Sequence, residues 1–262
     1  MSGYGHFAAF YDALTADVDY AGWAEYLLAV FRRHGGLSTQ LLDLACGSGS
    51  LTWELTKRGV DVIGVDSSAD MLAVAREKAA VAQAQPLFLC QDMRQLDLYG
   101  TVDGAVCLLD SLNHILSTAE LAEILRRLGL FIAPGGLLVF DANTPHKHAV
   151  TLGENAFVFE QEDCFCVWRN HYHSARRETV MRLDFFVPED AGYQRYSDEV
   201  RERAYSMATW KRLLAAAGFD LLAVYGEQSF SPPAADADRW VFVARNRAIG
   251  QKNPEDNGEN DG

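Results

Sequence analysis

Glycine and aspartate residues mark the points where successive apolar runs end in the first half of the chain. These residues are Gly47, Gly49, Asp66, Asp92 and Asp110. An aspartate at a strand end can accept hydrogen bonds from the two hydroxyls of a ribose, and a glycine turn lets a ligand approach the backbone because no Cβ intervenes. The carboxyl ends of parallel strands meet along one edge of a sheet. The sequence therefore predicts a site for a nucleoside-like molecule at such an edge.

The elements that would position these residues alternate between strands and helices, which is typical of an α/β fold. We expect strands from residue 41 and over 60–66, 86–90, 103–110, 137–143, 219–226 and 239–245. The intervening helices are expected over 52–58, 68–81, 119–130 and 208–217.

The glycine turn belongs to the pattern Asp43-x-Ala45-x-Gly47-x-Gly49. A dinucleotide fingerprint, Gly-x-Gly-x-x-Gly, would need a third glycine where this chain has Thr52. The pattern instead resembles the first motif of class I S-adenosylmethionine (SAM)-dependent methyltransferases. Ala45 stands where that motif often has its first glycine.

Two later segments resemble further elements of the same family. Gln91-Asp92-Met93 is similar to its adenine-binding element, and Pro134-Gly135-Gly136 is similar to the turn before its fifth strand. The resemblance covers about residues 40–245. It implies a seven-stranded Rossmann-like sheet that is parallel apart from an antiparallel C-terminal hairpin strand, with helices on both faces. It also implies SAM as cofactor and S-adenosylhomocysteine (SAH) as product.

The resemblance assigns cofactor contacts along the strand ends. In the family, the acid of the first motif holds the loop and the amino-acid end of the cofactor, the acid at Asp66 binds the ribose, and Asp92 binds the adenine amino group. The expected set is Tyr11, Asp43, Ala45, Gly47, Gly49, Asp66, Ser67, Met71, Asp92, Met93, Leu109 and Asp110. Asp66 as a helix cap and Met71 as a core residue are the structural alternatives.

Residues 1–36 carry aromatic side chains at helical spacing. We expect two short helices, the second capped by Asp17 or Asp19. They form either an amphipathic cover on the sheet or a lid over the cofactor.

The lid interpretation rests on the pair Tyr11-Asp12, which resembles the pair that folds over the cofactor in related small-molecule enzymes. Tyr20 and Trp23 would then line the substrate side of the lid.

Residues 154–205 alternate between apolar and polar residues with a period of two, and turn-forming segments separate the runs. We expect an inserted antiparallel sheet that interrupts a core of 37–153 and 206–246. Such an insertion resembles the β cover of glycine and sugar-amine N-methyltransferases, and places Trp168 toward the substrate. Residues 247–262 lack apolar periodicity and are expected to form a disordered tail.

Methyl transfer from a sulfonium is an in-line displacement, so alignment supplies most of the catalysis. A hydroxyl acceptor would need a general base, whereas a neutral amine needs little. Candidate catalytic residues are His114, His171 and Tyr172. Asn113 and Asn143, after the fourth and fifth strands, are candidates for substrate contacts. The acidic residues of the insertion favour an amine acceptor over a hydroxyl acceptor.

A metal site is not expected. Cys164-x-Cys166 and His171-x-His173 resemble metal-ligand pairs, but along one strand they would spread over about 30 Å. Asp141 and Asn143 lack the spacing of a Mg²⁺-dependent subgroup.

Composition limits the class of partner. The chain has 262 residues, with 23 basic and 36 acidic side chains, so binding to nucleic acid is disfavoured. Five cysteines without a disulfide pattern, and no apolar segment long enough to span a membrane, predict a cytoplasmic protein. We expect a monomer or homodimer acting on a small molecule. Alternatives are a tRNA or protein methyltransferase, a non-catalytic SAM-binding protein, and a misassigned dinucleotide oxidoreductase.

Overall fold

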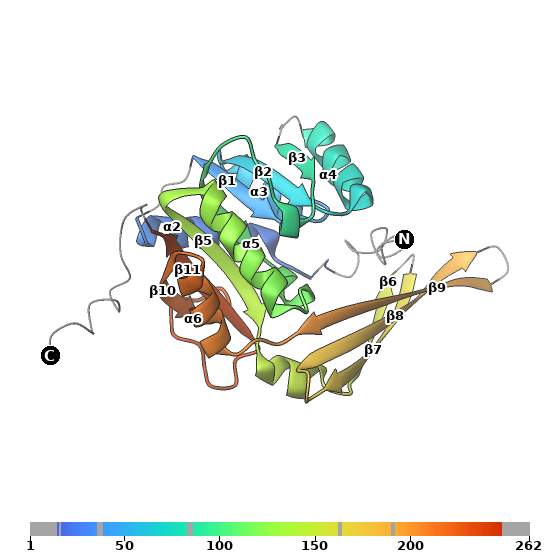
Figure 1. Ribbon diagram of the computed structural model, residues 1–262. Coiled ribbons are helices and arrows are strands. Elements are labelled where there is room, and N and C mark those ends of the chain that lie inside the picture. Colours follow the sequence, from blue (N-terminus) through green and yellow to red (C-terminus); the bar gives the residue numbers. More distant parts are fainter. Residues whose placement is uncertain are drawn as a thin grey trace, which may run out of the picture.

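The computed structural model describes residues 15, 17–35, 39–82, 86–161, 164–189 and 192–247, which form two sheets with helices packed around the first (Figure 1). The first sheet has seven strands in the order β10-β11-β5-β4-β1-β2-β3. Its strands are β1 (Gln40–Leu44), β2 (Asp61–Asp66), β3 (Leu87–Cys90), β4 (Val102–Cys107), β5 (Ile132–Asn143), β10 (Phe219–Tyr225) and β11 (Arg239–Asn246).

The strand directions agree with the predicted fold class. Strands β1 to β5 are parallel, and β11 runs antiparallel between β5 and β10. The order in which successive strands are added reverses between β1 and β4. The carboxyl ends of these two strands therefore form the crevice where ligands bind in such sheets.

Helices cover both faces of this sheet (Figure 1). One face packs against α2 (Tyr20–Arg33), α3 (Ser50–Lys57) and α4 (Ala69–Ala82), and the other against α5 (Thr118–Phe131) and α6 (Met207–Ala216). Short helical segments are η1 (Met93–Gln95), η2 (Ser111–His114) and the π-helical η3 (Lys147–Leu152). None of the helices in the described ranges is long and apolar enough to cross a membrane.

The second sheet is the predicted antiparallel insertion. It consists of β6 (Ala156–Gln161), β7 (Cys164–His173), β8 (Glu178–Glu189) and β9 (Gly192–Arg203), paired in chain order. In Figure 1 it extends to one side of the seven-stranded sheet. Its inner face has a small apolar core that includes Met181, Leu183 and Phe185, so the insertion folds around contacts of its own.

Several local predictions are confirmed at the residue level. The Asp19 carboxylate accepts a hydrogen bond from Gly22 N–H at 2.8 Å and caps α2. All five cysteines are free. Residues 1–14, which include Tyr11 and Asp12, and residues 248–262 lie outside the described residues. Arg247, at the start of the expected tail, pairs with Asp220 at 2.9 Å.

Strand boundaries differ from prediction in two places. The fourth strand stops at Cys107, because Leu109 and Asp110 adopt left-handed φ values of 55° and 52° and turn the chain into η2. The fifth strand begins at Ile132 instead of residue 137, because it continues the chain directly from the end of α5. The first difference matters for function, because it turns Asp110 out of the strand and toward η3 and β9.

Candidate functional site

The glycine turn after β1 has an alternating left-handed backbone. Ala45, Gly47 and Gly49 have φ values of 59°, 53° and 73°. A Cβ on Gly49 would lie 2.9 Å from the Cβ of Ala75 in α4, so close packing as well as backbone conformation requires glycine there. Ala45 has the same left-handed conformation without glycine's freedom, which places strain at the position where the family motif often has glycine.

Replacing Ala45 by glycine should therefore stabilise the fold by up to about 1 kcal/mol, because relief of the left-handed strain exceeds the extra entropy of glycine in the unfolded chain. Urea unfolding of both proteins measures the difference. Ala73, exposed in the middle of α4, gives a matched control, since its replacement by glycine should cost about 1 kcal/mol. Equal losses in the two variants would contradict a strained Ala45.

Asp43 is a buried carboxyl beneath the glycine turn. It is 2% exposed and accepts a hydrogen bond from the Thr52 hydroxyl at 2.5 Å. Burial raises the pKa of Asp43 to about 7, and the nearby charge of Asp66 adds to this effect. The folded protein therefore holds this proton more tightly than the unfolded chain does.

The stability contributed by Asp43 should fall as pH rises from about 4, the ordinary pKa of an aspartate, to about 7. Asp43→Asn removes the buried charge and keeps an acceptor for Thr52. We expect the variant to be more stable than the wild type at pH 8, with the difference shrinking toward pH 4. Urea unfolding across this range, with the exposed Asp97→Asn as control, measures it. A difference that grows toward pH 4 would contradict the raised pKa.

Asp66 closes the other side of the turn. Its Oδ2 accepts a hydrogen bond from Gly47 N–H at 2.9 Å, and its Oδ1 accepts one from Ser68 N–H at 2.8 Å. The neighbouring Ser67 carbonyl faces the Cys90 thiol at 3.7 Å. Asp66 therefore links the glycine turn to the start of α4, which supports the capping alternative. Its carboxylate still lies at the carboxyl end of β2, where the ligand is expected.

Among the described residues, a small cavity lies at the turn. Its volume is about 20 Å³, which is room for about one water molecule. Tyr20, Asp43, Ala45 and Leu109 are among its lining residues. Three of the predicted cofactor residues, Asp43, Ala45 and Leu109, and the predicted substrate residue Tyr20 meet there, and their contacts with ligands remain predictions.

The third strand end carries Asp92 and Met93. The Asp92 carboxylate caps η1 by accepting from Arg94 N–H at 2.9 Å, and it pairs with the Arg94 guanidinium at 2.6 Å. Met93 packs against the core under α5, and Met71 is 4% exposed in α4. The burial of Met71 agrees with the core-packing alternative, and its predicted cofactor contact remains a prediction.

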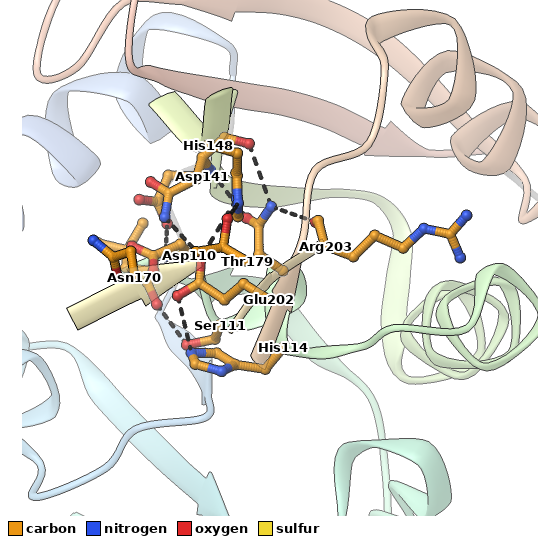
Figure 2. Close-up of polar contacts among 12 residues, drawn as sticks. Asp110, Ser111, His114, Asp141, His148, Asn170, Thr179, Glu202 and Arg203 are labelled. Atoms are coloured by element: carbon orange, nitrogen blue, oxygen red, sulfur yellow. Dashed lines mark hydrogen bonds and ion pairs between the residues drawn. The ribbon is translucent and has the colours of Figure 1, made fainter. Parts of the chain in front are cut away.

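A cluster of acids and histidines lies where β4, η2, η3 and β9 meet (Figure 2). Glu202 is at its centre: its Oε1 is 3.8 Å from His114 Nε2, and its Oε2 is 3.5 Å from His148 Nε2. Asp110 shares a hydrogen bond with Glu202. The side chain of His114 is 31% exposed, whereas those of Glu202 and His148 are 4% and 0% exposed. His114 is thus the member that a ligand can reach most directly.

The protonation states of the cluster follow from burial and charge. Burial raises the pKa of Glu202 well above its ordinary value, and the Asp110 charge raises it further. Burial opposes ionisation of Asp110, but Arg239 and Lys147 outweigh it and keep the pKa of that carboxyl below its ordinary value. The proton between the two acids therefore belongs to Glu202.

The two imidazoles are neutral for the same physical reason. Burial lowers the pKa of His114, although the Asp110 charge opposes this effect. Burial also lowers the pKa of His148 to about 4, and the Nδ1 of His148 lies 2.8 Å from the Thr179 hydroxyl. Nδ1 of His114 has no hydrogen-bond partner in the described structure. His114 is consequently neutral, and its unpaired Nδ1 is buried although the side chain as a whole is partly exposed.

Arg239, at the start of β11, holds the acids of the cluster in place. It is 2.9 Å from Asp110 and forms a further ion pair with the fully buried Asp141. The backbone N–H of Asp110 also donates to Asp141 at 3.1 Å. This network fixes the left-handed turn that directs Asp110 toward Glu202.

Asn113 and Asn143 form a buried, hydrogen-bonded pair beside the cluster. The Asn113 amide oxygen accepts from Asn143 N–H at 3.0 Å, and its amide nitrogen donates to the Arg203 carbonyl at 2.8 Å. Asn143 donates to Glu202 at 3.0 Å. Both side chains are almost fully buried, so they position the cluster, and their predicted substrate contacts remain predictions.

The other predicted residues lie apart from this cluster. His171 is exposed and contacts Glu154 at 2.8 Å, and Tyr172 N–H donates to the same carboxylate at 2.9 Å. Trp168 donates to Asn170 at 2.5 Å within the cover sheet. Trp23 is packed in the core, 2% exposed. Among the catalytic candidates, the structure thus brings only His114 to the acids at the ligand edge.

The sequence interpretation missed Glu202, His148 and Arg239. One feature of the sequence could have indicated that Glu202 is buried. Side chains alternate between the two faces of a strand, and Glu202 is two positions from the buried Val200, on the same face of β9. His148 lies in a π-helical segment without a clear sequence pattern. Arg239 precedes an apolar strand and resembles an ordinary charged strand end.

Asp110, His114 and Glu202 offer ligand atoms within 4.8 Å of one another, a donor set that suits several divalent metals. However, Asp110 is already paired with Arg239, and Glu202 accepts from Asn143. A metal ion would have to compete with these bonds and with the positive charges beside the cluster. The absence of a metal site therefore remains a prediction, which these competing bonds support.

Comparison with known proteins agrees with the strand-end geometry. Residues 41–136 match a family model described as a methyltransferase domain. A Bacillus subtilis protein named "Putative methyltransferase YqeM" is 30% identical over 244 residues, covering 92% of this chain and 96% of that protein. The chain belongs to the SAM-dependent methyltransferase family. This methyltransferase also matches the crystal structure of a SAM-dependent methyltransferase from Clostridium acetobutylicum, with 28% identity, a TM-score of 0.84, and coverage of 94% and 99% of the two chains.

More distant relatives of this methyltransferase have named substrates. A glycine/sarcosine N-methyltransferase from Halorhodospira halochloris is 29% identical over 227 residues, covering 84% of this chain and 79% of that one. Sugar-amine N,N-dimethyltransferases are also among its relatives. The predicted family, fold class and cofactor are therefore confirmed, and the methyltransferase depends on SAM.

Proposed function

We propose that this methyltransferase transfers the methyl group to the amine of a small molecule, which binds beside Asp110 and His114. The observation that supports this most is the cluster itself, because it combines a charged carboxylate with a neutral imidazole at the carboxyl end of β4. A carboxylate attracts a protonated amine, and a neutral imidazole can accept its proton. The named relatives that methylate amines support the same class of acceptor.

The cofactor side is assigned to the strand ends. Asp66 is proposed to hold the ribose and Asp92 the adenine, and the glycine turn lies under the remainder of the cofactor. When bound, SAM supplies a methyl group already activated by the sulfonium charge. The protein then has to align the acceptor and hold its proton, and alignment of this kind can contribute up to about 7–11 kcal/mol in ideal cases.

On the acceptor side, we assign three roles. Asp110 draws the ammonium form of the acceptor into the site, and the partly exposed imidazole of His114 takes the proton that leaves it. Glu202 is protonated and stays next to His114, so it adds no second negative charge. These roles need an amine whose pKa is high enough to arrive charged.

A macromolecular acceptor has less support. The exposed arginines of the cover sheet are largely paired: Arg169 and Arg195 with Asp184, and Arg182 and Arg201 with Glu199. This pairing neutralises four of the exposed basic side chains that binding to tRNA would need.

Transfer of labelled methyl from SAM should distinguish these classes. Acceptors would be matched pairs that differ in one group, such as glycine with glycolate and glucosamine with glucose, beside bulk tRNA and a protein mixture. We expect label on amine members of the pairs. Label on tRNA, on protein, or only on the hydroxyl members would contradict the proposal. Binding of SAM without any transfer would instead favour a non-catalytic SAM-binding protein.

A further inference from the structure

A second cavity, of about 320 Å³, lies where the cover sheet joins the core. It is formed by the turn between β7 and β8, the end of β9, and the first turns of α5 and α6. Figure 1 shows β9 leading into α6 at this junction. The residues that line the cavity include Arg176, Arg177, Arg203, Arg212, Ser206 and Thr209.

The cavity concentrates positive charge in an acidic protein. The chain carries 36 acidic and 23 basic side chains, yet four arginines line this one cavity, and none of its described lining residues is acidic. The guanidinium groups of Arg177 and Arg212 have no ion-pair or hydrogen-bond partner among the described residues. This contrasts with the paired arginines on the exposed face of the cover sheet.

The other two arginines are held in place and keep free donors. Arg176 is 3.4 Å from Glu178, which is the nearest balancing acid. Arg203 donates from Nη1 to the Leu116 carbonyl at 2.7 Å and lies over the Tyr205 ring. These contacts orient the Arg203 guanidinium and leave its remaining N–H groups available.

Neutral donors add to the positive field. The Ser206 hydroxyl caps α6, accepting from Thr209 N–H at 3.1 Å, and lies 2.9 Å from the Thr209 hydroxyl. The start of α6 therefore faces the cavity with the positive end of its dipole. The forked guanidinium groups match the oxygens of a phosphoryl group better than they match a single small anion.

We propose that this cavity binds a phosphoryl dianion, either free phosphate or the phosphate ester of a small molecule. It is separate from the transfer site, because side chains alternate along β9 and place Glu202 in the cluster but Arg203 in the cavity. The two sites still share a backbone contact, since the Asn113 side chain in the cluster donates to the Arg203 carbonyl. The proposal goes beyond the amine methyltransferase function and does not depend on it.

Calorimetric titration of the full chain at low ionic strength tests the proposal. The probes are inorganic phosphate and phenyl phosphate, with sodium chloride at matched ionic strength as reference. The double variant Arg177→Ala/Arg212→Ala removes the two unpaired guanidiniums. The control Arg126→Ala/Lys211→Ala removes the same number of charges from exposed positions outside the cavity lining. Thermal unfolding and SAH binding check that each variant folds.

We expect saturable binding of one phosphate per chain, weakened at least about tenfold in Arg177→Ala/Arg212→Ala and little changed in the control. Tighter binding of phenyl phosphate than of phosphate would identify an ester as the natural form, and the reverse order would identify free phosphate. No saturable binding to the wild type would overturn the proposal. Equal weakening in the two double variants would overturn it as well, because it would show attraction to overall charge only.

Discussion

Replacing His114 by alanine should lower the rate of methyl transfer to an amine by about 10²–10⁴-fold, the range typical for loss of a general base. The residue has a neutral imidazole, its side chain is 31% exposed, and one of its ring nitrogens lies within 4.8 Å of carboxylate oxygens of Asp110 and Glu202. Its loss removes the proton acceptor and leaves the glycine turn untouched. Single-turnover rates with labelled SAM would measure the effect, and SAH calorimetry would show unchanged cofactor affinity.

Two comparisons make this result specific. His146→Ala, at a half-exposed histidine paired with Asp238, should leave the rate unchanged. Partial rescue of His114→Ala by added imidazole would show that the lost group is a base and not a packing contact. If His171→Ala lost the activity instead, the assignment of His114 would be wrong.

Replacing Arg239 by methionine should destabilise the fold by about 3–5 kcal/mol, because it leaves two buried carboxylates without their cation. Arg239 is within 2.9 Å of Asp110 and also pairs with Asp141, whose side chain is 0% exposed. Burial raises the pKa of Asp141, an effect that Arg239 opposes. The loss in the variant should therefore shrink as pH falls and the carboxyls are protonated.

Urea unfolding of wild type and Arg239→Met, at neutral and mildly acid pH, measures this effect. Arg182→Met serves as control, since Arg182 is exposed and pairs with Glu199 at 3.3 Å, and a surface ion pair contributes at most about 1 kcal/mol. A loss in Arg239→Met no larger than in this control would show that the acids of the cluster do not depend on Arg239.

The strand ends could be predicted from the sequence because each is signalled locally. A capping aspartate, a glycine turn or an acid after an apolar run depends on neighbouring residues alone. Asp19, Gly49 and Asp66 all lie at the element boundaries that their residue types indicate. The motif that matches the methyltransferase family is built from such local signals, so fold class and cofactor were both accessible.

The acid and histidine cluster could not be predicted in the same way. Glu202 and His148 come from β9 and a π-helical segment and meet Asp110 only after the cover sheet docks on the core. The left-handed turn at Asp110 depends on a hydrogen bond to Asp141, which is 31 positions away in the sequence. Asp141 in turn pairs with Arg239, which is 98 positions further along. A period of two along β9 indicates which face Glu202 occupies, but not what lies opposite that face.

A crystal structure of the full chain with SAH bound is the most direct measurement of how this methyltransferase works. We expect the ribose hydroxyls on Asp66, the adenine beside Asp92 and Met93, and the sulfur directed at Asp110 and His114, with the glycine turn moved apart from Asp66. A sulfur atom that points away from the Asp110–His114 cluster, or a ribose held by other residues, would contradict the account.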